Sequence, residues 1–407
     1  MQEGDTRSGA AAVWANPSLR RLVLGATFAG LAESALWIAV IVIAYAEGGP
    51  ALAGVAVAAQ LIPAGLAAPA GGLVADRWHR SRVLTLSYAA LGVISASMGV
   101  SVIADLPFVV VLVLGAVGAS LFAIIAPVQI SLVPELSDRP EEAVAGNGAL
   151  GFVGSLSWAI GPLLAAWLLG YGPTAVFLVM SVVAGVGTLL VLGLNDHRNT
   201  DDHAHAASWV GFLDLVRTKG AGALLAVAAV VNFTAGGLEI LVAGAAIDLL
   251  GLGDEGVGYL WAAVGIGGMA GSSLLLRLAG RRRLTGLIVG GALVWGASIA
   301  FLGWAPGLLV ALVLLFVNGV AELVLLISGQ TMIQRVVAPH LMSRAFGTAE
   351  GLRQGALALG SLAFGLLMAA IGIPLSAAVL GALVPLVVLV VTPMLKHVDD
   401  GVAVPWW

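Results

Sequence analysis

Long uninterrupted runs of apolar residues dominate the hydrophobic pattern of this chain. The runs at 52–75 and 83–104 contain no charged residue, and a short charged island separates them. As a helix, each run is long enough to cross a hydrocarbon core about 30 Å thick. The pattern therefore predicts membrane-spanning helices joined by short turns.

Twelve such runs follow one another, and Pro and Gly mark the turns between them. The expected spans cover residues 20–46, 51–75, 83–104, 107–133, 142–169, 174–194, 221–250, 256–279, 284–304, 307–336, 342–371 and 373–395. A long polar segment at 195–219 divides them six and six. We therefore expect an all-α integral membrane protein with two pseudo-symmetric six-helix halves. The first half covers 1–194, a cytoplasmic linker follows at 195–219, and the second half with a short tail covers 220–407.

The charges of the turns fix the expected orientation. If the N-terminus lies inside, the Lys and Arg residues of the turns all fall on the inner face. The charged residues of the outer turns are then all acidic: Glu47, Asp105, Asp254 and Glu255. An excess of Lys and Arg in short loops marks the cytoplasmic face of a membrane. We therefore expect both termini in the cytoplasm.

Composition agrees with a membrane protein. The 407 residues are 60% hydrophobic and 10% charged, with a mean hydropathy of +1.06, whereas a soluble domain carries about a quarter charged residues. Because the chain has no Cys, it has neither a disulfide nor a thiolate metal site. The preference for Arg over Lys, with many Ala, Gly, Val and Leu residues, indicates the cytoplasmic membrane of a bacterium.

Three carboxylates, Glu33, Glu239 and Glu322, lie inside expected spans. An ionised carboxylate at that depth costs several kcal/mol, so each must face a cavity, find a partner or stay protonated. Asn232 and Asn318 share helix faces with Glu239 and Glu322, respectively, by their spacing. These five residues predict a polar cavity that binds a cationic substrate or a proton. The alternative is a set of interhelical hydrogen bonds made by protonated Glu side chains.

The two halves resemble each other around two of these carboxylates. Residues 29–33, Ala-Gly-Leu-Ala-Glu, are similar to residues 235–239, Ala-Gly-Gly-Leu-Glu. Parallel repeats of this kind place a site near the middle of the membrane, between the halves. We therefore expect Glu33 and Glu239 to line one central cavity.

The charged island between the second and third runs has a specific spacing. It reads Gly72-x-x-x-Asp76-Arg77-x-x-Arg80-x-Arg82, which resembles the signature loop of the major facilitator superfamily of transporters. The resemblance implies two halves that alternate access to a central site, and it gives the island a gating role. Asp76 is then expected to meet the N-terminal end of span eleven, where the helix dipole favours an anion. The three Arg residues are expected to contact neighbouring loops and lipid phosphates.

Two further motifs belong to this picture. Gly161-Pro162 in span five resembles a helix-packing element of exporters in this superfamily, and ordinary helix packing is the alternative.

Glu350 and Arg353 in span eleven have the spacing of a local ion pair, and an inner-gate pair with another span is the alternative. The segments 16–22 and 133–147 are similar to the branch that contains enterobactin and macrolide exporters. Span four lacks the Arg that takes part in coupling in many proton-coupled drug exporters.

Together these features predict a secondary transporter that exports a small amphipathic compound, with proton coupling left open. The alternatives are an uptake symporter, a lysolipid flippase or the membrane part of a sensor. We expect no enzyme activity, because the chain has no phosphate-binding loop of the Gly-x-x-x-x-Gly-Lys type and no nucleophile–base set. We expect no cofactor, no metal, no nucleic-acid partner and a monomer. Its partners are the substrate, protons and membrane lipids.

Overall fold

The computed structural model describes residues 13–77, 79–194, 221–278, 284–336 and 342–401. Inside helices, its description excludes the side chains of residues 68–77, 140, 221, 272–278, 330, 333–336, 342–351 and 397–401. The helices are α2 (Pro17–Arg77), α3 (Arg80–Ile103), α4 (Phe108–Glu135), α5 (Pro140–Leu169), α6 (Pro173–Val191), α8 (Ala221–Gly244), α9 (Gly253–Leu278), α10 (Thr285–Leu302), α11 (Leu308–Val336), α12 (Met342–Ile371) and α13 (Ile373–Gly401). A π-helical turn, η1 (Ala245–Leu249), follows α8.

Helix α2 holds two of the expected spans. Its 61 residues would reach about 90 Å as a straight helix, about three times the thickness of a hydrocarbon core. At Gly48 and Gly49 the backbone leaves the helical region, with φ −148° and ψ 22° at Gly48 and φ 66° and ψ −162° at Gly49. A positive φ favours glycine because glycine has no Cβ. The predicted turn between 46 and 51 is therefore confirmed.

With α2 divided at this turn, the described chain contains twelve α-helical runs and no strand. Ten stretches of the described residues are long and apolar enough to cross a membrane, and one of them, Pro17–Ala67, includes both arms of α2. The observed bounds follow the predicted ones closely. For example, α4 covers 108–135 against a prediction of 107–133. The prediction of an all-α membrane protein is confirmed.

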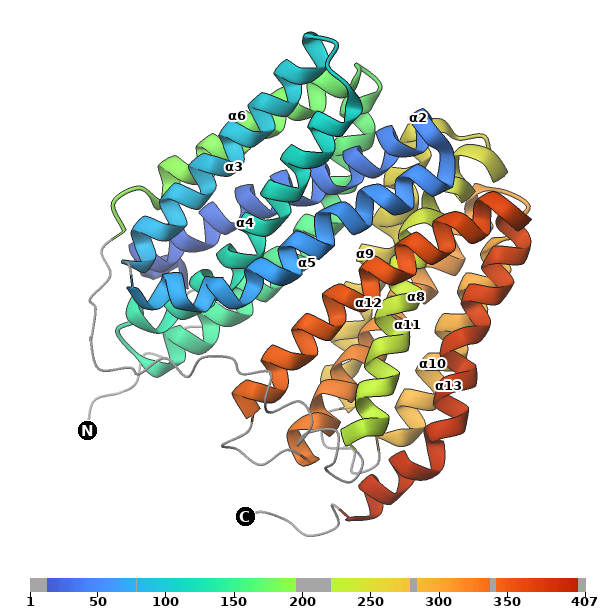
Figure 1. Ribbon diagram of the computed structural model, residues 1–407. Coiled ribbons are helices and arrows are strands. Elements are labelled where there is room, and N and C mark those ends of the chain that lie inside the picture. Colours follow the sequence, from blue (N-terminus) through green and yellow to red (C-terminus); the bar gives the residue numbers. More distant parts are fainter. Residues whose placement is uncertain (1–12, 78, 195–220, 279–283, 337–341, 402–407) are drawn as a thin grey trace.

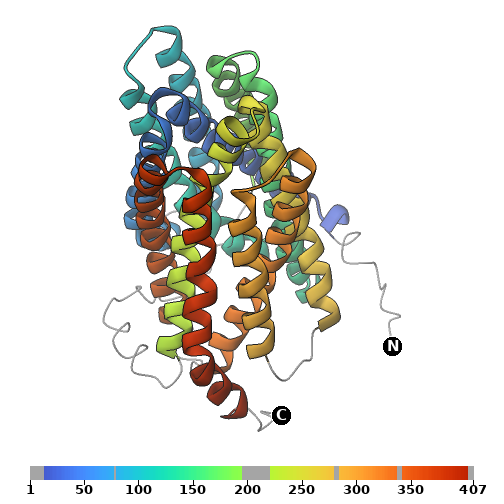
Figure 2. The same cartoon turned by 90° about the vertical axis from the view of Figure 1, so that its right-hand side faces the viewer.

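The helices form two bundles. Figure 1 shows α2–α6, in blue and green, beside α8–α13, in yellow and red, and Figure 2 shows the long axes of the helices running roughly alike. Within the first bundle, α2 packs on α4, α5 and α6, and α3 packs on α6. In the second, α8 packs on α12, α9 on α11, and α10 on α13. The bundles meet where α2 packs on α12 and α8, and where α5 packs on α9.

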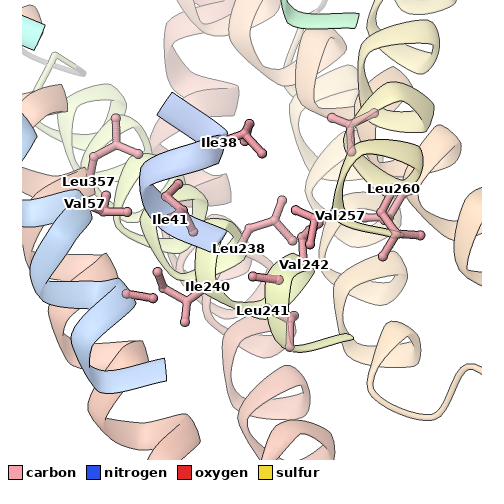
Figure 3. Packing of buried hydrophobic residues seen from close by; sticks show 14 of the residues in the cluster. Ile38, Ile41, Val57, Leu238, Ile240, Leu241, Val242, Val257, Leu260 and Leu357 are labelled. Carbon is pink, nitrogen blue, oxygen red and sulfur yellow. The ribbon is translucent and has the colours of Figure 1, made fainter. Parts of the chain in front are cut away.

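A buried apolar core continues from one bundle into the other. Figure 3 shows Ile38 and Ile41 of α2 near Leu238 and Val242 of α8. Leu260 of α9 belongs to the same group and is fully buried. Because dispersion contacts in such a core are individually weak but numerous, the contact between the halves has a large apolar component.

Helices in the second bundle approach each other through paired glycines. In each pair of helices, a glycine of the first helix packs against a backbone carbonyl of the second, and a glycine of the second packs against a backbone carbonyl of the first. The contacts are Gly236 with Leu357 and Gly360 with Phe233 between α8 and α12, and Gly267 with Phe316 and Gly319 with Val264 between α9 and α11. Small residues allow membrane helices this close approach.

The repeated sequence pattern has a matching structural environment in both halves. Gly30, in the first span, packs against Ser157 of the fifth span, and Gly236, in the seventh, packs against Leu357 and Ser361 of the eleventh. Spans one and seven are therefore equivalent in their packing partners as well as in sequence. This is the correspondence that a repeat of six spans would give.

The contacts between the halves are concentrated on one side of the molecule. We call the end with the turns at Gly49, Gly172 and Gly372 the Gly49 side, and the opposite end the Arg80 side. Close contacts near the Gly49 side join Gly54 to Ser361, Gly365 to Pro50, Gly258 to Pro162 and Ala166, and Gly265 to Ala159. The Ser361 hydroxyl also donates a hydrogen bond to the Gly54 carbonyl at 3.2 Å.

Toward the Arg80 side the two bundles separate. Gly148, Gly151 and Gly154 of α5 have no atom within 4 Å of the position where a Cβ would lie. The ribbons of α2 and α12 also diverge in this direction in Figure 1. The described residues thus form a molecule whose halves are closed together on the Gly49 side.

Candidate functional site

Glu33 lies in the first arm of α2, where small residues hold the helix against α5. The neighbouring Ser34 is fully buried, and its hydroxyl donates to the Ser157 carbonyl at 2.8 Å. Glu33 itself is partly buried. It lies close enough to Arg353 of α12 for their charges to interact. The structure therefore brings a carboxylate of the first half toward a cation of the second half.

Glu239 is the most buried of the three carboxylates, with 8% of its surface exposed. The preceding turn of α8 is fixed by Gly236 against α12 and by Gly237 against Leu380 and Phe364. The indole nitrogen of Trp37, one turn after Glu33 on α2, lies beside the Glu239 carboxylate without meeting the geometry of a hydrogen bond. Glu239 Oε2 and Trp37 Nε1 are both buried, and neither has a hydrogen-bond partner among the described residues.

Glu322 of α11 completes the group. It is partly buried, and its charge acts on Glu239. The structure therefore places two pairs of interacting charges in the middle of the spans: Glu33 of α2 with Arg353 of α12, and Glu239 of α8 with Glu322 of α11. The carboxylates of this group outnumber its cation. We call Glu33, Glu239, Glu322 and Arg353 the central charged cluster.

The two predicted Asn residues differ in their surroundings. Asn232 is partly buried, and its amide donates to the Ala228 carbonyl of its own helix at 2.8 Å. Asn318 is fully buried and donates to the Ser298 hydroxyl of α10 at 3.1 Å. Asn318 thus joins two helices of the second half. It makes no hydrogen bond to a carboxylate of the cluster among the described contacts.

The predicted gating loop is described in part. Gly72, Asp76 and Arg77 lie in the last turns of α2, and their side chains fall outside the described residues. Arg80 forms an ion pair with Glu135 at the end of α4. Arg82 is exposed. The described part of the loop is therefore tied to the neighbouring turn of the same half.

Of the remaining predicted residues, Gly161 and Pro162 take part in helix packing. Gly161 lies directly against Ser34 of α2, and a Cβ at Gly258 of α9 would lie only 2.6 Å from the Pro162 carbonyl oxygen. This element joins span five to both span one and span eight. Glu350 lies in α12, and its side chain is outside the described residues.

Sequence reasoning missed the role of Trp37. The signal was its spacing, because residues four apart share a helix face, which places Trp37 on the face of Glu33. Sequence reasoning also gave no role to individual residues in the segment 16–22. In the structure, Asn16 Oδ1 accepts the backbone N–H groups of Ser18 and Leu19, at 3.0 and 3.1 Å, and caps α2. The Arg21 guanidinium donates to the Leu190 and Leu192 carbonyls at the end of α6.

The described residues contain no group of three or more His, Asp and Glu side chains that could hold a metal ion. The three His residues of the linker, at 197, 203 and 205, lie outside the described residues.

The fold and this mid-span cluster define a polytopic helical membrane protein with a polar site between two bundles. A sequence model of the Major Facilitator Superfamily matches residues 22–361. The chain belongs to this superfamily and is a membrane transporter of this type. A sequence comparison with curated proteins gives no match.

Solved structures share the fold at low sequence identity. The human organic anion transporter MFSD10 is 17% identical, with a TM-score of 0.66 over 92% of this chain and 98% of that one. The nucleoside transporter NupG is 14% identical, with a TM-score of 0.72 over 92% and 99%. A bacterial homologue of the human lysosomal transporter Spinster, in an inward-facing and occupied conformation, is 16% identical, with a TM-score of 0.70 over 94% and 92%.

Proposed function

We propose that this chain is a secondary active transporter that exports a small amphipathic cation in exchange for protons. The observation that carries the proposal is the central charged cluster. It combines groups from both halves, and its carboxylates outnumber its one cation. Polar and ionisable residues inside a membrane mark substrate and ion pathways. The similarity of segments 16–22 and 133–147 to exporter sequences supports the direction.

Alternating access would act on this cluster through the contacts between the halves. In the present arrangement the halves are packed together on the Gly49 side. Opening that side requires α2 to move against α12 and α5 against α9. Because Glu33 and Arg353 lie on opposite halves, such a movement changes the distance between their charges. Binding of a cation at the carboxylates is then coupled to the movement.

The residues of the gating loop, Asp76 with Arg77, Arg80 and Arg82, are proposed to hold the Arg80 side closed in the opposite state. Glu350 is proposed to act at the same gate, because it precedes Arg353 in α12 and so lies nearer the Arg80 side. We further propose that the linker and both termini are cytoplasmic, in a bacterial inner membrane, and that the protein works as a monomer without cofactor. Gly161 and Pro162 are proposed to serve as the pivot of span five.

Transport by the purified protein in proteoliposomes tests this function. Vesicles with an acid interior should accumulate ethidium, a lipophilic cation, because protons leave as the cation enters, and nigericin should abolish the accumulation by collapsing the pH gradient. Accumulation only with an alkaline interior would indicate a symporter instead. Failure to move ethidium and the other compounds of a cationic, neutral and lysolipid panel under either gradient would contradict the proposal.

A further inference from the structure

A hydrogen bond on the Gly49 side connects the two halves through side chains. Tyr45 lies at the end of the first span, just before the turn at Gly48 and Gly49, and only 5% of its surface is exposed. Its hydroxyl donates to Asp248 Oδ2 in η1 at 2.5 Å. Asp248 itself is exposed. A buried phenol of one half thus reaches a solvent-facing carboxylate of the other.

The backbone around Asp248 is specialised for this contact. The residues of η1 form a π-helical turn, in which the Leu250 N–H donates to the Ala245 carbonyl at 2.9 Å. The Leu252 N–H donates to the Ala246 carbonyl, also at 2.9 Å. The first of these bonds encloses one residue more than an α-helical bond and the second encloses two more, so the backbone around Asp248 departs from α-helical geometry. Single π turns are rare and occur frequently at functional positions.

Glycine at position 244 makes room for the same contact. A Cβ there would lie 2.8 Å from the Tyr45 hydroxyl oxygen and 2.9 Å from Met368 Cε of α12. Both distances are shorter than side-chain carbon atoms tolerate. Three spans, α2, α8 and α12, therefore converge at this point, two of them from the second half.

We propose that the Tyr45–Asp248 hydrogen bond is a releasable latch that closes the Gly49 side. The other contacts between the halves described above for this side are close packing at glycines and a hydrogen bond from the Ser361 hydroxyl to the Gly54 carbonyl, and none of them involves a charged group. The latch differs because its acceptor is a charged group that water can solvate as soon as the halves separate. A hydrogen bond to a charged group is stronger than one between neutral groups, so the latch favours the closed state. When the latch opens, water solvates the exposed Asp248 carboxylate, so opening does not leave a charge buried without a partner.

Removal of either partner should shift the balance between the closed and open states of this side. Tyr45→Phe keeps the ring and its packing but removes the hydroxyl, and Asp248→Asn keeps the shape but removes the charge. Because a hydrogen bond to a charged group contributes on the order of tenfold or more to an equilibrium, we expect each variant to raise the ratio of open to closed molecules about tenfold. The double variant should shift the ratio no further than Tyr45→Phe alone, because Tyr45→Phe already removes the bond that Asp248→Asn weakens to one between neutral groups.

Spin labels measure this ratio directly. The chain has no native Cys, so cysteines at the exposed positions Leu106, in the first half, and Leu375, in the second, take one nitroxide each. Tyr45→Phe and Asp248→Asn should both increase the population of long distances. Tyr259→Phe is a matched control, because the Tyr259 hydroxyl donates to Glu255 of its own helix at 3.3 Å on the same side. It should leave the distances unchanged.

Two outcomes would overturn the latch. One is a distance distribution in Tyr45→Phe that equals that of the parent protein. The other is a double variant whose shift is the product of the two single shifts, which would mean that the residues act independently. Thermal unfolding in detergent accompanies each measurement, and an equal unfolding temperature in Tyr45→Phe and Tyr259→Phe separates a change of state from a loss of structure. This test needs no transported substrate, so it stands apart from the proposed direction of transport.

Discussion

Glutamine in place of Glu239 will remove transport driven by a pH gradient while the protein stays folded. Glutamine has the same shape and keeps its hydrogen-bonding capacity, but it carries no charge and binds no proton. Glu239 is 8% exposed, its Oε2 has no hydrogen-bond partner among the described residues, and both Trp37 and Glu322 lie near its carboxylate. Because glutamine can neither carry the charge nor bind the proton, we expect a loss of about tenfold or more, equivalent to at least ~1.4 kcal/mol.

Glu33→Gln should also reduce transport, by a different route. It removes the charge that interacts with Arg353 across the two halves. We therefore expect a weaker dependence of transport on pH in this variant, together with a change in the rate at which the halves exchange states. Glu47→Gln serves as the matched control, because Glu47 is exposed at the end of the first span. Initial rates of ethidium accumulation between pH 5.5 and pH 8.5, roughly the range over which His and perturbed carboxylates titrate, give the comparison. Parent-like pH profiles in both cluster variants would assign Glu33 and Glu239 to packing.

Alanine in place of Gly319 will destabilise the second bundle strongly. A Cβ at this position would overlap the Val264 carbonyl oxygen and crowd the Gly268 backbone nitrogen. Backbone atoms cannot turn aside as the end of a side chain can, so α9 and α11 must separate. Overpacking of this kind costs about 1–3 kcal/mol, and here it also disturbs the return contact between Gly267 and Phe316.

Gly290→Ala gives the matched control for this prediction. Gly290 lies in α10, and no atom lies within 4 Å of the position of its Cβ. The same added methyl group therefore meets open space, and the higher helix propensity of Ala is expected to stabilise the protein slightly. Apparent unfolding temperatures in detergent compare the two variants. An unfolding temperature for Gly319→Ala at or above that of Gly290→Ala would show that the glycine contacts do not hold the helices together.

The hydrophobic pattern predicted the helices well because membrane spans leave little choice. A long run without charges lies in the membrane, and there a helix satisfies the backbone N–H and C=O groups within the same segment. The turn at Gly48 and Gly49 and the bounds of α4 and α5 follow from this constraint alone. The resemblance of residues 72–82 to a transporter signature added the family, which the match over 22–361 confirms.

The sequence predicted candidate residues for the site but not which residues of other helices contact them. The cost of a buried charge singled out Glu33, Glu239 and Glu322, but sequence spacing does not say which residues of distant helices face them. Asn318 illustrates the limit: residues four apart on a helix differ by about 40° in direction, and this side chain turns to Ser298 of α10.

The two interpretations of Arg353 could not be separated from the sequence, because its i, i+3 neighbour Glu350 and a residue of another span were equally available. In the structure its charge interacts with Glu33. Tyr45 and Asp248 could not be paired in advance either. Their contact depends on the π turn at 245–249, which moves Asp248 out of ordinary helical register.

Water access to the middle of the spans tests the central claim most directly. Cysteine replaces Asn232, which is partly buried on the same helix as Glu239, or Val390 of α13, which is 77% exposed on the outside of the bundle. A charged methanethiosulfonate reagent reacts with thiolates in water and not with thiols in lipid. We predict that Asn232→Cys reacts at least about tenfold faster than Val390→Cys, and that ethidium slows its reaction. Equal and slow reaction of both variants would mean that no water-filled site lies between the halves.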